Sequence, residues 1–216
     1  MRAFVLLLVS SLLTLSCLAG DDAPPLKFRS GFDGMSVGFT GGAGNRAGIK
    51  GGNPDDGKQW LKVDAIYTVD APLEYLPLVR FKIYMDVDSP KGKLSDTSNT
   101  TPALLYGEAS YVNVPNALPG HELHVTFYLH PYTMHRFGGD KNFSRFDADR
   151  NIHIDAYVGD EKVDGRDYRE VPAENAKWYL ADGLPRISGF LLPQEQTGFN
   201  KNDVTYPQPQ VKSAGE

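Results

Sequence analysis

Apolar and polar residues alternate with a period of two along several stretches of the chain, as expected for β-strands, whose successive side chains point to opposite faces. Residues 79–87 show the pattern most clearly, with five apolar side chains on one face: Val79, Phe81, Ile83, Met85 and Val87. The residues between them, Arg80, Lys82, Tyr84 and Asp86, are expected to point outward. Further strands are expected at 35–39, 61–69, 104–114, 123–129, 152–158, 162–163 and 187–192.

The segments between these strands are typical of turns. Residues 40–58 are rich in glycine, and residues 89–102 and 130–150 are polar. Only residues 172–179 favour a short helix, with Pro172 near its first position, where proline is tolerated. The pattern predicts an all-β fold, an immunoglobulin-like β-sandwich of about seven or eight strands with one or two short helical turns. A closed barrel is the alternative.

The N-terminal residues form a different kind of segment. A single cation, Arg2, precedes an apolar run from Ala3 to Leu15, and the small residues of Cys17-Leu18-Ala19 follow. This order predicts a signal peptide over residues 1–19, cleaved before Gly20. The run is shorter than the roughly 20 apolar residues that a transmembrane helix needs, and no second segment is apolar enough to span a membrane. We therefore expect an exported protein in the periplasm, on the outer membrane surface or outside the cell.

Cys17 leaves a second processing route open. It is the only cysteine of the chain, and bacterial lipoproteins are cut just before a cysteine that is then acylated. Ser16 fits that pattern, whereas Thr14 and Leu15 fit it poorly. By either route the mature domain lacks a disulfide, and we expect residues 20–199 to be long enough to bury a core without one. Residues 200–216 are expected to form a partly flexible polar tail.

Mass spectrometry of the mature N-terminus distinguishes the two routes. Ordinary signal cleavage predicts a chain that begins at Gly20 or later and carries no lipid. A mature chain that begins at an acylated Cys17 would instead show that the protein is anchored to a membrane.

The charge of the chain argues against one class of function. The net charge is −5 and becomes more negative when Arg2 is removed with the signal. No stretch is strongly basic, which argues against nucleic-acid binding because such binding needs clustered Lys and Arg.

Two glycine- or aspartate-rich motifs resemble binding loops without meeting their requirements. Gly42–Ala47 matches a dinucleotide fingerprint, but the glycines and the proline that follow prevent the helix that such a site needs. Asp147–Asn151 resembles the start of a calcium loop, but Ile152 and Val158 stand where glycine and glutamate are required. We interpret both segments as loops.

The remaining chemistry points away from an enzyme. The five histidines, His121, His124, His130, His135 and His153, are not spaced to converge on one metal ion. A Gly-x-Ser-x-Gly elbow is absent, and no carboxylate pair stands out, although two acids distant in sequence can still meet in the fold. Asn99 and Asn142 begin glycosylation-type triplets that we interpret as loop residues. We therefore predict no catalytic, cofactor-binding or metal-binding residues and no cofactor.

The aromatic residues Trp60, Trp178 and Tyr179 are expected to belong mainly to the core. A fraction of the aromatic side chains on the surface would suit contact with a partner or a sugar.

The C-terminal third carries a resemblance to a known family. The motifs Lys177-Trp178-Tyr179-Leu180, Gly189–Pro193 and Gln194–Phe199, together with the signal and the length, resemble the secreted immunoglobulin-like proteins of verrucomicrobial type IV pilus gene clusters. The resemblance implies a β-sandwich, export and association with pilus assembly or the cell surface. It carries over no functional residue. Unlike pilin subunits of this class, the chain has a short apolar segment that ends in an ordinary signal site, which favours an accessory or surface factor.

Three functional hypotheses follow. The first is an exported, non-enzymatic structural or interaction protein that contacts pilus-assembly or envelope proteins, or further copies of itself, through sheet edges and outward aromatic residues. The alternative is a carbohydrate-binding (mucin-binding) module, which requires a row of exposed aromatic side chains on one sheet face. A hydrolase, the third, requires a cleft with facing carboxylates.

Overall fold

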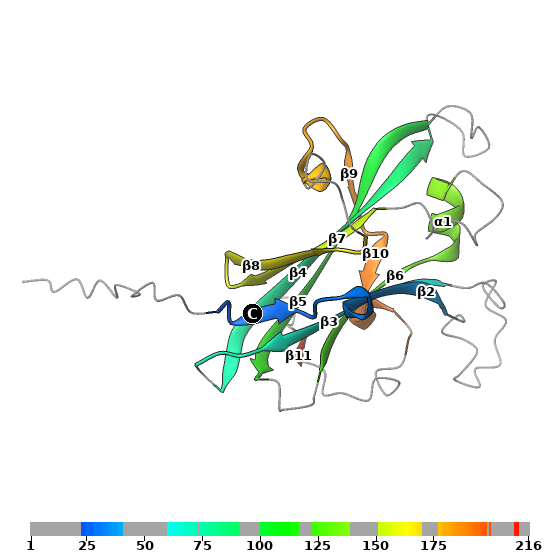
Figure 1. Cartoon of the computed structure of the whole chain (residues 1–216). Helices are drawn as coiled ribbons and strands as arrows, with labels where there is room; N and C mark the ends of the chain where they lie inside the picture. Colours follow the sequence, from blue (N-terminus) through cyan, green and yellow to red (C-terminus); the bar gives the residue numbers. More distant parts are fainter. Residues whose placement is uncertain are drawn as a thin grey trace, which may run out of the picture.

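The alternating segments form two β-sheets that pack face to face (Figure 1). The computed structural model describes residues 23–40, 60–72, 74–90, 100–116, 122–138, 151–169, 177–197, 199 and 210–211. The expected signal peptide and the Gly42–Ala47 motif lie outside these residues. The all-β sandwich is confirmed, and the arrangement is not a closed barrel.

In the five-stranded sheet, the first long strand along the chain is β3 (Trp60–Val69). β1 (Leu26–Phe28) and β2 (Met35–Thr40) pair with opposite ends of β3, and the short 3-10 helix η1 (Phe32–Gly34) separates them. On its other side β3 pairs with β6 (Leu123–Leu129), and β6 with β10 (Leu191–Pro193). All of these pairs are antiparallel.

The six-stranded sheet is built on a long antiparallel hairpin of β4 (Tyr75–Pro90) and β5 (Thr100–Pro115), strands of 16 residues each. β7 (Ile152–Val158) pairs with β4, and β8 (Glu161–Asp167) pairs with β7. At the other edge β5 pairs with β9 (Arg186–Ser188), in parallel, and with β11 (Gln210–Val211).

Three helical segments complete the described fold: α1 (Pro131–Gly138), η5 (Trp178–Leu180) and η6 (Gln194–Gln196). No helix in the described part of the chain is long and apolar enough to cross a membrane.

The core lies between the sheets and follows the predicted alternation. The five inward residues of β4 are all buried, and Phe81 is completely inaccessible to solvent. Its ring lies 4.8 Å from that of Tyr67 and 6.0 Å from those of Phe28 and Tyr111, measured between ring centroids. Because Tyr67 and Phe28 come from one sheet and Phe81 and Tyr111 from the other, these rings join the two layers.

The predicted loop at 130–150 is wrong in its first part, where α1 begins at Pro131. Proline fits the first turn of a helix, and Met134 and Phe137, three residues apart, are both buried on one side of it. This short apolar face was too brief to give a helical period in the sequence. The predicted polar turn at 89–102 is also too long, because β4 continues to Pro90 and β5 starts at Thr100.

The single strand predicted at 187–192 is wrong as well. It divides into β9 and β10, which belong to different sheets. Gly189 lies between them with φ 84°, a left-handed conformation that glycine adopts without strain and that redirects the chain. The helix predicted at 172–179 falls largely outside the described residues, and its end is the 3-10 helix η5.

Replacing Phe81 tests whether the aromatic contacts between the two sheets stabilise the fold. The substitution Phe81→Ala is expected to lower the free energy of unfolding by about 3–5 kcal/mol, because it removes a buried ring and leaves a cavity between the layers. Urea denaturation followed by circular dichroism measures the change.

Thr68→Ala, on the exposed side of β3, serves as the matched control and is expected to change little. An equal loss in the two variants would contradict the central role of Phe81.

Candidate functional site

The outer face of the six-stranded sheet carries an ionisable cluster where β7 and β8 meet. The side chains of Ile152 and Ile154 enter the core, so His153 and Asp155 lie on the opposite, outer face of β7. His153 and Asp155 are nonetheless 4% and 2% exposed, almost as buried as the core. The cause is η5, which lies against this face beside the long hairpin (Figure 1).

His153 lies between two carboxylates. Its Nε2 is 2.7 Å from Oδ1 of Asp155, and its Nδ1 is 3.0 Å from Oδ1 of Asp167 on β8. An ionised carboxylate only accepts hydrogen bonds, so both contacts are hydrogen bonds only when both ring nitrogens carry a proton. Burial by itself lowers the pKa of His153, but the two carboxylates outweigh burial and raise the pKa above 6.5. The geometry is therefore that of an imidazolium ion.

Lys162 of β8 supplies the second positive charge. Its Nζ lies 2.5 Å from Oδ1 of Asp155. Burial raises the pKa of Asp155, but hydrogen bonds from His153 and Lys162 bring it below the usual 3.8. Two cations thus face two carboxylates, and the cluster is neutral while His153 is protonated.

Gly165 makes room for this cluster. It pairs with Asp155 across the β7–β8 ladder, and a β-carbon there would lie 2.8 Å from Oδ1 of Asp155 and 3.2 Å from Nε2 of His153. Any side chain at this position would therefore displace the ion pair.

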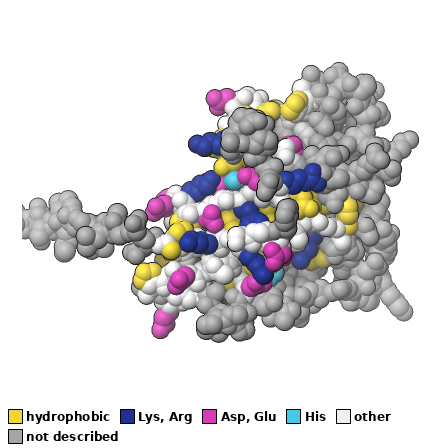
Figure 2. All heavy atoms as spheres, viewed as in Figure 1, with side chains coloured by type: hydrophobic (Ala, Val, Ile, Leu, Met, Phe, Trp, Pro, Cys, Tyr) yellow, Lys and Arg dark blue, Asp and Glu magenta, His cyan; other side chains and the backbone are white. Residues whose placement is uncertain are grey.

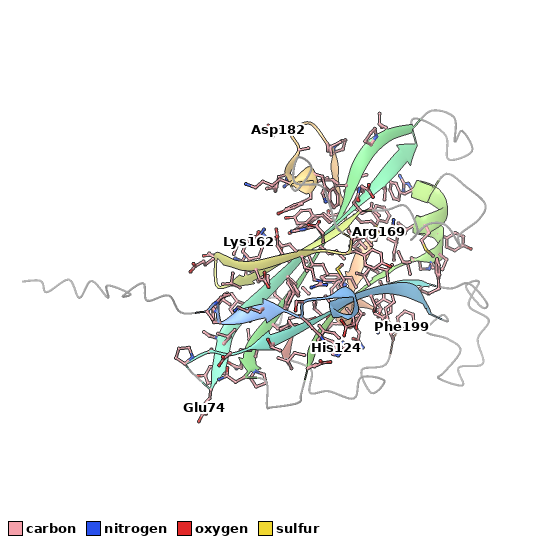
Figure 3. All side chains as sticks on the ribbon, viewed as in Figure 1. Glu74, His124, Lys162, Arg169, Asp182 and Phe199 are labelled. Carbon is pink, nitrogen blue, oxygen red and sulfur yellow. The ribbon has the colours of Figure 1, made fainter. Side chains whose placement is uncertain are left out.

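The cluster attaches η5 to the sheet through side chains. The ring of Tyr179 stacks on His153, with centroids 3.8 Å apart and planes 12° apart. The Nζ of Lys162 donates to the Tyr179 hydroxyl at 3.1 Å, and Nε1 of Trp178 donates to Oδ1 of Asp167 at 3.2 Å. Figure 3 shows Lys162 on the β7–β8 hairpin and Asp182 in the chain that continues from η5.

The tyrosines of the neighbouring strands extend the site. Tyr84 of β4 lies 5.1 Å from Tyr179 and 5.5 Å from Tyr106 of β5, between ring centroids. Burial, with the nearby charge of Asp155, raises the pKa of Tyr84 to about 12, so its hydroxyl stays protonated. The predicted outward orientation of Tyr84 is correct, but the residue is buried because η5 covers it.

A smaller cluster lies on the outer face of the five-stranded sheet. Oδ2 of Asp64 is 2.8 Å from Nδ1 of His124, and Thr126 donates to Oδ1 of Asp64 at 2.5 Å. Burial raises the pKa of Asp64, but His124, Lys62 and Thr126 together lower it below 3.8. The hydroxyl binds the carboxylate and not the histidine, which differs from a Ser-His-Asp triad, where histidine takes the proton of the nucleophile.

Aromatic rings gather at one end of the same sheet. Trp60 contacts His130 and Phe199 edge to face, at centroid distances of 4.5 and 5.4 Å. His130 also stacks with Tyr132 of α1, a residue that is 51% exposed.

The histidines that the sequence analysis considered as metal ligands lie in separate parts of the structure. His124 and His153 lie in different sheets, and His130 belongs to the aromatic group. His121 and the side chain of His135 lie outside the described residues. Within the described part of the chain, no group of three or more His, Cys, Asp or Glu side chains is arranged to hold a metal ion. In the calcium-like motif only Asn151 is described, and it donates to Asp86 at 2.7 and 2.9 Å.

Sequence reasoning missed the cluster around His153 because its other members come from separate segments, Lys162 and Asp167 from β8 and Tyr179 from η5. Tyr179 was expected in the core; it is buried, but on the outer face. The available signal was the alternation Ile152-His153-Ile154-Asp155, which places two ionisable groups together on one face.

The fold and the buried clusters define a β-sandwich module, and comparison with known proteins gives its family. The sequence model of one protein family matches residues 46–211, more than half of the chain, so the protein belongs to this family. The match agrees with the resemblance to verrucomicrobial pilus-associated proteins that the C-terminal motifs indicate. A crystal structure of a protein from Akkermansia muciniphila has a similar fold, with a TM-score of 0.60 and 17% sequence identity over 88% of this chain and 93% of that chain. The search of curated proteins found no match.

Removing one charge tests whether the cluster around His153 stabilises the fold. Asp155→Asn is expected to lower the free energy of unfolding by about 3 kcal/mol at pH 6, because it leaves His153 and Lys162 with one carboxylate between them. Urea denaturation measures the loss.

Asp160→Asn, which removes an exposed carboxylate paired with Arg80, is the control and is expected to leave the unfolding midpoint in place. Equal stability of the Asp155→Asn variant and the wild type would show that the cluster is not needed for folding.

Proposed function

We propose that the protein is an exported, non-enzymatic structural or interaction protein of a type IV pilus-like assembly or of the cell surface. Its partners are pilus-assembly or envelope proteins, with self-association into a homo-oligomer as one form of contact. The observation that carries the proposal is the family match, which spans most of the sandwich.

The ionisable clusters support a structural role. Both ring nitrogens of His153 face carboxylates of the same chain, and Asp64 receives hydrogen bonds from Thr126 and His124. A general base needs a position from which to reach a substrate proton. The described contacts of His153 and Asp64 instead join neighbouring strands and, at His153, hold η5.

The described surface suits contacts with other proteins. Lysine, arginine and acidic side chains alternate over the face seen in Figure 2, without a large field of one sign. β2 pairs with β3 on one side, and no described strand pairs with its other side. Such an edge offers backbone groups to a further strand.

The alternative, a carbohydrate-binding module, receives limited support. The large aromatic side chains that are exposed among the described residues are Tyr75 and Tyr132. They belong to the start of β4 and to α1, and Figure 3 places Glu74, which precedes Tyr75, far from α1. The group of Trp60, His130 and Tyr132 is the feature that favours a sugar, since aromatic faces stack on apolar ring surfaces.

Affinity capture from an envelope extract of the source organism tests the proposal. The mature protein with a C-terminal tag is expected to enrich pilus-assembly proteins, identified by mass spectrometry, over an unrelated exported β-sandwich with the same tag.

Absence of that enrichment, together with retention of the protein on a mucin column that Tyr132→Ala abolishes, would replace the proposal by the carbohydrate-binding alternative. Enrichment without mucin retention supports the structural role.

A further inference from the structure

We propose that His153 operates a pH-dependent latch: its protonated ring holds residues 177–180, the latch segment, on the outer face of the six-stranded sheet, and loss of the proton releases that segment. This inference concerns a movement within the chain and does not depend on the identity of any partner.

The latch segment has few other attachments. Among the described residues, its backbone hydrogen bonds are internal, from the amide of Leu180 to the carbonyl of Lys177 and from that of Ala181 to the carbonyl of Trp178, at 2.8 and 3.2 Å. No strand in the described part of the chain pairs with it, and η5 has three residues. Among the described contacts, the side chains of Trp178 and Tyr179 hold the segment in place.

Each of these two side chains depends on a group that also binds His153. Trp178 donates to Oδ1 of Asp167, the same atom that faces Nδ1 of His153. Tyr179 stacks directly on the imidazole and accepts from Lys162, whose other partner, Asp155, faces Nε2 of His153. A change at the imidazole therefore reaches both attachments.

The protonation state decides whether the two carboxylates can remain in place. A neutral imidazole has a single N–H and donates to one carboxylate, so its other nitrogen presents a lone pair to the second. Asp155 is 3% exposed and remains paired with Lys162, whereas Asp167 is 25% exposed, measured on the side chains. Asp167 is thus the group that can turn towards solvent, and Trp178 then loses its acceptor.

The charged and titratable groups around the ring come from every described element packed against it. They are Asp155 and Tyr157 on β7, Lys162 and Asp167 on β8, Tyr84 on β4 and Tyr179 on η5, with Arg186 of β9 over the ring of Tyr84. Loss of the proton leaves two carboxylates, Asp155 and Asp167, with Lys162 as the one cation of the cluster. A cationic ring also binds the face of Tyr179 better than a neutral one does.

The sign of the pH dependence follows from the raised pKa of His153. The latch is fully held below about pH 6.5, the ordinary pKa of histidine, and weakens as the pH rises through the higher pKa of the attached state. For each pH unit that separates these two values, attachment weakens about tenfold.

NMR titration of the folded protein between about pH 5 and pH 9 tests the latch. The ring signals of His153 report its protonation, the indole N–H signal of Trp178 reports its hydrogen bond, and heteronuclear NOE values of residues 177–180 report their order. Trp60→Phe identifies the Trp178 signal, since the chain has two tryptophans. The expected result is one shared midpoint above pH 6.5 for all three, with residues 177–180 losing order on the alkaline side.

Variants separate the latch from a general effect of pH. His153→Gln is expected to keep Trp178 in the released state at every pH, whereas His124→Gln, in the other sheet, is expected to retain the wild-type transition. Asp167→Asn removes the carboxylate that a neutral imidazole repels and is expected to abolish the transition. A Trp178 signal that does not follow the titration of His153 in the wild-type protein, or a transition that survives in folded His153→Gln, would overturn the proposal.

Discussion

Apolar packing between the two sheets is the interaction on which the rest of the structure depends. The chain has one cysteine, Cys17, so no disulfide within it can join the layers. β4 is central to this packing, because it pairs with both β5 and β7 while its inward residues build the core. The ring of Phe81 contacts aromatic rings of both sheets. Every feature on the outer faces takes its position from strands that this core holds in register.

The same strands of the six-stranded sheet carry the charged cluster around His153 on their outer face. Buried charges cost desolvation energy, which is recovered only when each charge is paired and hydrogen-bonded. The pairing of His153 and Lys162 with Asp155 and Asp167 meets this condition, and it is completed by the aromatic side chains of η5. A segment that pairs with no described strand is thereby placed at one position on the sheet, through polar and aromatic side-chain contacts.

The family match and the structure give different information about function. A β-sandwich hosts many unrelated functions, so the fold does not assign one. The family match agrees with the resemblance to pilus-associated proteins that the sequence indicates. The structure adds that the histidine–carboxylate clusters on the described faces make contacts within the chain, and that β2 is paired on one side.

Local residue patterns determined the long strands and their inward faces, because the period of two follows from the geometry of a single extended strand. These patterns failed at α1, where Met134 and Phe137 form a short apolar face, and at 187–192, where one glycine turn directs β9 and β10 to different sheets. For the cluster around His153, local patterns place only His153 and Asp155 on one face of a strand. The cluster brings together β7, β8 and η5, and only the tertiary structure decides which side chains from distant segments meet and whether an outward residue is covered.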